Sequence, residues 1–192
     1  MCLLSAERLR LLASLETYFC ATNDDEGIYV NLFVDGHADL TVGERTVSLS
    51  QRTRYPWDGD VHIEIATIEE PATFDRFAAF DLHLRVPSWC EDPSLPVKGE
   101  LVVIEIDTGY ATIQREWTGG DTIDLSLLMT VETLSAHPDV KVDAGRVALR
   151  RSPVVYYLEG IDNDRPLHHL QLPHDSLLYV GTIGTRRRYE CG

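Results

Sequence analysis

The sequence predicts a mainly β protein, an antiparallel β-sandwich of jelly-roll-like type preceded by one amphipathic α-helix. Three observations predict this fold. Apolar and polar residues alternate over several short segments, turn-forming residues separate these segments at near-regular spacing, and no helical pattern lies between them after residue 27. Many short strands in such an order are typical of a two-layer antiparallel fold.

The helix is predicted over residues 6–19, where apolar residues recur at helical spacing. Ser5 is placed to cap its start, and the acidic stretch 23–27 follows its end. One amphipathic helix cannot bury its own apolar stripe, so it must pack on something else. If the stripe stays uncovered, we expect a homo-oligomer formed through it. The stripe consists of Leu11, Leu12, Leu15, Tyr18 and Phe19.

Strands are predicted from Gly27 onward, where the apolar period changes from about 3.6 to two. In residues 28–34, Tyr29, Asn31 and Phe33 alternate with aliphatic residues and are predicted to face solvent. The same alternation occurs over 61–66 and 80–86. Further strands are expected at 45–51, 100–106, 110–115, 121–128, 145–150, 153–158 and 177–180. The predicted domains are a helical segment at 1–24, a middle β-sandwich at 25–135 and a partial C-terminal β domain at 136–192.

The charge balance is strongly acidic, with 31 Asp and Glu against 17 Lys and Arg and a formal net charge of −14. Such a surface repels a phosphate backbone, which argues against a nucleic-acid partner. Only Lys98 and Lys141 are lysines. An acidic, lysine-poor surface is typical of a halophilic protein, because carboxylates hold solubility in high salt. A GC-rich genome, which favours arginine codons, would give the same pattern, and both explanations stay open.

The cellular location is predicted to be cytoplasmic. No apolar run approaches the roughly 20 residues that a membrane helix needs. The first residues gain charge too early for a signal peptide, so no membrane association is expected. The cysteines show no C-x-x-C spacing, which favours reduced thiols over a disulfide framework. They are Cys2, Cys20, Cys90 and Cys191.

Three tryptophans are the candidate substrate-binding residues. Trp57 lies in the string YPWDGD at 55–60, which could stack on a sugar ring but is more typical of a β-turn at the end of a sheet. Trp89 and Trp117 lie where strands are expected to end. They could line a carbohydrate groove, although large aromatic residues at such places more often close a core.

Other catalytic or metal-binding patterns are weak. Neighbouring histidines on a strand point to opposite faces, so His168 and His169 would rarely share one ion. With His174, they are better interpreted as part of a solvated polar loop, and no metal site is predicted. The sequence contains no Gly-x-Ser-x-Gly elbow, P-loop or dinucleotide-binding fingerprint.

Several strings, in order over about residues 8–160, resemble glycoside hydrolase family 127, the β-L-arabinofuranosidase family. Residues 10–15 (RLLASL) resemble the last helix of that family's catalytic barrel, and residues 28–34 resemble the strand that leaves it. Residues 51–61 (QRTRYPWDGDV) resemble the signature of its middle domain. Residues 84–90 (LRVPSWC) match its Leu-Arg-Ile/Val-Pro-x-Trp string. Further matches follow at 109–110, 115–117, 120–123, 145–149, 151, 153 and 155–156.

The resemblance implies a retaining glycosidase with an (α/α)₆ barrel followed by two β-sandwich domains. In this family the nucleophile is a cysteine thiolate held with zinc by neighbouring cysteines and a glutamate, and a second glutamate is the acid/base. The nucleophile lies in a Cys-Cys-Pro-x-Asn string just before the helix at 10–15, so the cysteine pair should fall at Leu3 and Leu4. Cys2 is out of register and can only be a relic of that string.

The resemblance therefore implies a non-catalytic chain with no cofactor of its own, because the zinc site and both glutamates belong to the barrel. We expect it to be inactive alone and to need a separately encoded catalytic barrel as partner. The alternative is a free-standing carbohydrate-binding or structural module that binds arabinose-containing glycans through Trp57, Trp89 or Trp117. A third explanation is the product of a truncated gene.

Overall fold

The structure is a computed structural model of the 192-residue chain. Among the residues it describes, no helix is long and apolar enough to cross a membrane. The chain divides into two compact units, Met1–Leu128 and Met129–Gly192, and each is described by itself. The described residues are 10, 14–23, 27–69, 77–102, 104–162, 166–167, 170–173, 175–183 and 186–191.

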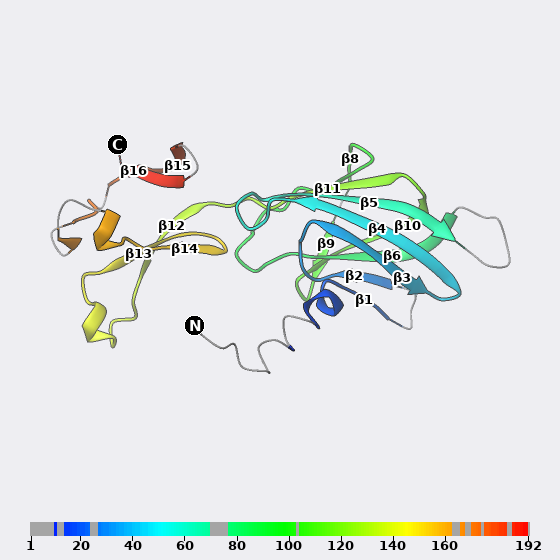
Figure 1. The fold of residues 1–192 in the computed structure, drawn as a ribbon, viewed down its shortest axis with the longest axis horizontal. Helices are drawn as coiled ribbons and strands as arrows, with labels where there is room; N and C mark the ends of the chain where they lie inside the picture. Colours follow the sequence, from blue (N-terminus) through cyan, green and yellow to red (C-terminus); the bar gives the residue numbers. More distant parts are fainter. Residues whose placement is uncertain are drawn as a thin grey trace. The chain divides into compact units, whose positions relative to one another are not determined.

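Unit 1 contains two sheets (Figure 1). The five-stranded sheet has the order β1-β2-β6-β10-β9 and the six-stranded sheet the order β3-β4-β5-β11-β7-β8. The strands of the first sheet are β1 (Cys20–Thr22), β2 (Gly27–Val30), β6 (Phe77–Arg85), β9 (Glu105–Asp107) and β10 (Tyr110–Thr118). Those of the second are β3 (Gly36–Val42), β4 (Arg45–Thr53), β5 (Asp60–Glu69), β7 (Pro96–Val97), β8 (Glu100–Leu101) and β11 (Asp121–Ser126).

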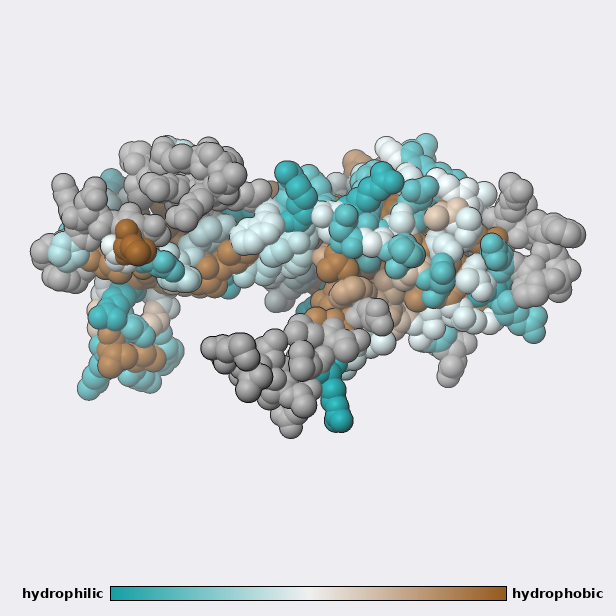
Figure 2. All heavy atoms as spheres, in the orientation of Figure 1, coloured by the Kyte–Doolittle hydropathy of each residue, from teal (hydrophilic) through white to brown (hydrophobic). Residues whose placement is uncertain are grey.

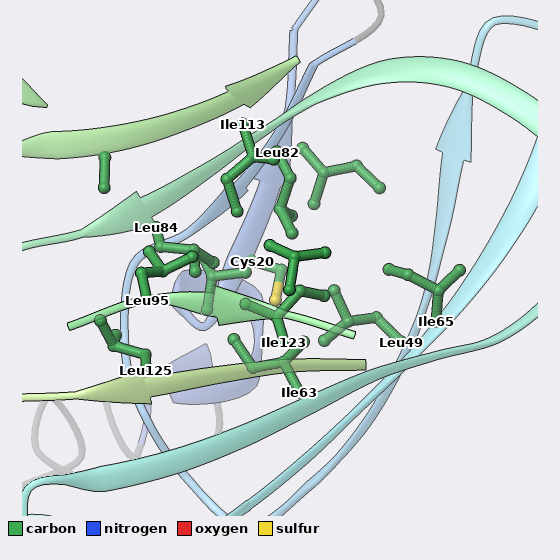
Figure 3. Packing of buried hydrophobic residues seen from close by; sticks show 14 of the residues in the cluster. Cys20, Leu49, Ile63, Ile65, Leu82, Leu84, Leu95, Ile113, Ile123 and Leu125 are labelled. Carbon is green, nitrogen blue, oxygen red and sulfur yellow. The ribbon is translucent and has the colours of Figure 1, made fainter. Parts of the chain in front are cut away.

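The two sheets enclose one hydrophobic core. Leu82 and Ile113 come from the first sheet and Ile63 and Ile123 from the second, and all four belong to the same buried cluster (Figure 3). The alternation along β5 places every second side chain in this cluster, because Val61, Ile63 and Ile65 are buried. Each such side chain contributes about 1.5–3 kcal/mol on burial.

The prediction of a mainly β chain is confirmed, but the sheets are not purely antiparallel. Strand β2 pairs with β6 in parallel, with Ile28 opposite Leu82, whereas the other strand pairs are antiparallel among the described residues. Alternation of apolar residues reveals neither that β2 pairs with a strand far along the chain nor that the two strands run in parallel. The jelly-roll-like order stays a prediction.

The predicted strand at 28–34 is too long, and the predicted exposure of Phe33 is wrong. Strand β2 ends at Val30, and the backbone N–H groups of Asn31 and Leu32 both donate to the Phe19 carbonyl. The chain turns there, so the alternation does not continue. Phe33 is 5% exposed and packs edge-to-face against Tyr55, with 5.8 Å between the ring centroids.

Five strands of the structure were not expected from the sequence: β1, β3, β7, β12 (Val131–Ser135) and β16 (Arg186–Cys191). β3 is an edge strand in which only Val42 is buried, and β1 and β7 are only two or three residues long. Short or polar edge strands carry little periodic signal. The expected strand at 100–106 is instead two strands, β8 and β9.

The amphipathic α-helix predicted over 6–19 is not established by the described residues. Arg10 and Ser14 have α-helical backbone, and Leu15–Tyr18 forms a 3₁₀ helix, η1. Leu11 and Leu12 lie outside the described residues. Phe19, from the same stripe, packs against the core of unit 1, so part of the stripe is covered within this chain. The proposed homo-oligomer through the stripe stays a prediction.

Unit 2 has two small sheets. β12 pairs with β13 (Val147–Arg151), and β13 pairs with β14 (Val154–Tyr156). A two-stranded ladder follows, formed by β15 (Leu178–Ile183) and β16 (Arg186–Cys191). Short 3₁₀ helices lie at Lys141–Asp143 (η2) and Gly160–Asp162 (η3). The predicted domain boundary after residue 135 lies beyond β12, whose partner β13 belongs to unit 2.

Candidate functional site

Trp117 lies inside the core and not on a surface. Its side chain is 0% exposed, and its Nε1 donates a hydrogen bond of 3.0 Å to the Phe80 carbonyl. The ring stacks on Phe80 at 5.8 Å, and the Arg115 guanidinium lies 5.2 Å from its centroid. A ring buried to this extent offers no face to a sugar. Trp117 therefore stabilises the core. This agrees with the sequence analysis, in which a core role was the favoured interpretation of an aromatic residue at a strand end.

Trp89 is half-buried and packs against the same core. It lies in a turn after β6, closed by a 2.9 Å hydrogen bond from the Cys90 N–H to the Pro87 carbonyl. Most of the ring surface is therefore used for packing. The three tryptophans do not form one platform, because one is fully buried, one is half-buried and one is exposed.

Trp57 is 54% exposed and lies in the turn between β4 and β5. The turn contains a cis peptide bond between Tyr55 and Pro56 and a 2.9 Å hydrogen bond from the Trp57 N–H to the Arg54 carbonyl. An Arg54–Asp58 ion pair spans its base. Tyr55 points the other way, against the core, and this burial raises the pKa of its phenol, while Arg85 partly offsets the shift. Of the three candidate rings, Trp57 has the most surface to offer a ligand.

The residues considered from the sequence as catalytic or metal-binding lie outside the described part of the chain. They are Cys2, His168, His169 and His174. Among the residues that the structure describes, no group of three or more His, Cys, Asp or Glu side chains could hold a metal ion. The described residues therefore do not fit the zinc site that the resemblance implies for the barrel, and no catalytic step is derived through zinc.

Among the described cysteines, Cys20 has a thiol pKa that is shifted from its usual value. It lies at 9% exposure in the core, and burial raises the pKa of its thiol to about 11 (Figure 3). A nucleophilic cysteine requires the opposite shift, because the thiolate is the reactive form. Cys20 is therefore a core residue and not a second candidate for the nucleophile.

We expect Cys20 to resist alkylation in the folded protein. The neutral, buried thiol should react with iodoacetamide at pH 8 at least about 100-fold more slowly than in the urea-unfolded chain. Peptide mass spectrometry after timed quenching measures this for Cys20 separately from the other three cysteines. Equal labelling rates in the folded and unfolded chains would contradict the burial of this thiol.

An aromatic cluster on the outer face of the five-stranded sheet was not identified from sequence. Tyr29 stacks on His83 at 4.1 Å with 13° between the rings, and Tyr110 meets Tyr29 edge-on at 5.4 Å. Thr112 lies 2.9 Å from His83 Nδ1, and the Tyr110 hydroxyl donates a 2.7 Å hydrogen bond to Asn31. Alternation placed Tyr29 and His83 on outer faces, but only the parallel pairing of β2 with β6 brings them together.

Two family models match the chain. The first describes the middle domain of glycoside hydrolase family 127, a β-L-arabinofuranosidase family, and matches residues 27–129. The second describes the C-terminal domain of the same family and matches residues 131–184. A non-reducing end β-L-arabinofuranosidase from Bifidobacterium longum subsp. longum is 30% identical over 167 residues. That alignment covers 85% of this chain and 24% of the relative.

Solved structures of family 127 proteins are also similar to this chain. The crystal structure of a GH127 β-L-arabinofuranosidase from Geobacillus stearothermophilus T6 is 37% identical with a TM-score of 0.78. It covers 91% of this chain, which spans 27% of that protein. The GH127 β-arabinofuranosidase BT3674 is 28% identical with a TM-score of 0.83, covering 95% of this chain and 31% of its own length. The chain thus spans about a quarter to a third of the relatives that it matches.

Proposed function

Because the chain belongs to glycoside hydrolase family 127, we propose that it is the β-sandwich portion of a β-L-arabinofuranosidase and supplies no catalytic residue. The observation that carries the proposal is the identity of the matched models, which are the middle and C-terminal domains and together cover residues 27–129 and 131–184. Hydrolysis of terminal β-L-arabinofuranosides would then depend on a catalytic barrel, present in the same protein or encoded separately.

The composition of unit 1 supports a scaffolding role. Its inward side chains fill one core, and one of the three candidate binding residues, Trp117, is part of that core. The described thiol with a shifted pKa, Cys20, is shifted away from reactivity. These residues stabilise a fold, and neither presents a nucleophile or an acid/base to a glycosidic bond.

A segment replacement tests this role. Residues 27–128 of this chain should replace the matching segment of the Geobacillus relative, and the chimera should still hydrolyse an aryl β-L-arabinofuranoside, because the scaffold carries no part of the chemistry. The matched control is the same chimera with Gly59→Ala in the grafted segment. This substitution should disrupt the scaffold, because an added Cβ would lie 2.0 Å from the Leu127 carbonyl oxygen. A chimera that folds with an unchanged melting temperature but shows no hydrolysis would count against a purely structural role.

A second candidate function is a carbohydrate-binding module, favoured by the exposure of Trp57. It predicts that arabinose-containing oligosaccharides quench or shift the fluorescence of the wild-type chain and that Trp57→Ala removes the response. Trp117 is buried, so its emission is a constant background in both proteins. The absence of any oligosaccharide-dependent change in the wild type would dismiss this alternative.

A further inference from the structure

The outer face of the five-stranded sheet carries a row of outward side chains that crosses all five strands. Strand pairing places these residues side by side, and the alternate residues on β2, β6 and β10 are buried in the core. The row consists of Ala21, Tyr29, His83, Thr112 and Glu105. Two rings of the aromatic cluster therefore lie in this row, and Tyr110 lies two residues from Thr112 on β10.

The outer face of the six-stranded sheet has a different chemistry. Two rows of paired outward residues cross it, and they contain hydroxyl, charged and histidine side chains. They are His37, Ser50, Glu64 and Thr122, and Arg52, His62 and Asp124. Tyrosine is enriched at protein interfaces, whereas charged residues are depleted from their centres. Of the two faces, the five-stranded one is therefore suited to a protein partner and the six-stranded one to solvent.

The aromatic cluster is held in one geometry within the chain itself. Tyr29 stacks on His83, and Tyr110 contacts Tyr29 edge-on. The Tyr110 hydroxyl is bonded to Asn31, and His83 Nδ1 lies 2.9 Å from the Thr112 hydroxyl. All three rings are nevertheless only half-buried, so each keeps surface that a partner could cover. Rings that are already ordered lose little conformational freedom on binding, which favours association.

The route of the chain and the comparisons indicate which partner lies near this face. The middle-domain model begins at residue 27, the first residue of β2, and the chain spans only about a quarter to a third of its relatives. These relatives therefore also contain a part that precedes the middle domain. The chain reaches β2 through η1 and β1, and β1 is the neighbour of β2 in the sheet. Figure 2 shows hydrophobic side chains on the surface near η1. The preceding part is thus attached beside the aromatic face.

We propose that the outer face of the five-stranded sheet is the docking surface for the catalytic barrel. The inference rests on the proposed function, which supplies the barrel as the partner. Tyr29, His83 and Tyr110 lie on the three middle strands of the sheet and are the anchors. Glu105 and Asp107 are exposed on the edge strand β9. The facing surface of the barrel should therefore present apolar groups to the rings and Lys or Arg to these carboxylates.

A matched pair of threonine variants tests this face. Thr112→Lys places a long charged side chain in the aromatic row, and Thr122→Lys makes the same change on the outer face of the six-stranded sheet. Both threonines are half-buried. Each variant is made in the isolated chain and in the chimera that carries residues 27–128 in the Geobacillus relative. Differential scanning calorimetry measures the temperature at which the β-sandwich unfolds in each protein.

Contact with the barrel should raise the unfolding temperature of the sandwich in the parent chimera above its value in the isolated chain. Thr112→Lys should lower this temperature at least about three times as much in the chimera as in the isolated chain, because only the chimera has a docked partner to lose. Thr122→Lys should lower it equally in both proteins. Gln114→Lys, at an exposed position on β10, is the second variant if Thr112→Lys unfolds the isolated chain, and the same result is expected.

Three results would overturn the proposed docking surface. They are a parent chimera whose sandwich unfolds no higher than the isolated chain, equal losses from the β10 variant in both proteins, and a larger loss in the chimera from Thr122→Lys. The scaffold role is judged separately, because calorimetry does not depend on turnover. A chimera in which the sandwich is stabilised but arabinofuranoside hydrolysis is absent would count against the scaffold role and leave the docking surface supported.

Discussion

Gly59→Ala should destabilise unit 1 by more than about 3 kcal/mol or prevent it from folding. Gly59 is buried, and an ideal Cβ at this position would lie 2.0 Å from the Leu127 carbonyl oxygen and 3.0 Å from its carbon. The Leu127 N–H also donates a 2.9 Å hydrogen bond to the Gly59 carbonyl. The methyl group thus meets backbone and not a flexible side chain, so the two segments must separate. Urea unfolding followed by circular dichroism measures the loss as a shift in midpoint.

Gly160→Ala is the matched control for this substitution. Nothing lies within 4 Å of an ideal Cβ at Gly160, and its backbone is not in the left-handed region. The same methyl group should therefore change stability by no more than about 0.5 kcal/mol. If Gly59→Ala unfolds at the same urea concentration as Gly160→Ala and the wild type, the close approach of Leu127 to Gly59 is not present in solution.

Trp117→Ala should cost about 3–5 kcal/mol of stability. The ring is 0% exposed, stacks on Phe80 and lies 5.2 Å from the Arg115 guanidinium, so its removal leaves a cavity in the shared core. It also removes the Nε1 donor to the Phe80 carbonyl. Trp117→Phe keeps part of the ring volume but not this donor, and should fall between the wild type and Trp117→Ala.

Trp57→Ala provides the comparison at an exposed ring. Its side chain is 54% exposed, so the substitution should cost no more than about 1 kcal/mol. Thermal and urea unfolding of all the variants give the order of stabilities. Equal losses for Trp57→Ala and Trp117→Ala would contradict the different burial of the two residues and reopen Trp117 as a surface residue.

The alternating strands could be predicted from sequence because their inner faces lie on one core. β5 and β6 follow the predicted alternation, with Ile63 and Leu82 inside. β3 could not be predicted, since only Val42 of this edge strand is buried and the strand therefore lacks a regular alternation of buried apolar residues. The parallel pairing of β2 with β6 depends on contacts between residues about 50 positions apart, as between Ile28 and Leu82, which local patterns do not encode.

The candidate site was predicted less well than the fold. The string at 55–60 was identified, with a turn as the favoured interpretation, and the structure shows such a turn with Trp57 exposed. The cluster of Tyr29, His83 and Tyr110 was missed, because only the parallel pairing of β2 with β6 brings Tyr29 next to His83.

The central claim is that this chain is a scaffold without catalytic residues, and turnover by the purified chain tests it most directly. The chain is incubated with an aryl β-L-arabinofuranoside and zinc, with the full-length Geobacillus relative as positive control and unfolded chain as blank. We predict no release of the aryl alcohol above the blank, and release only when a catalytic barrel is added. Saturable hydrolysis by the isolated chain, lost on mutation of one of its own residues, would contradict the account.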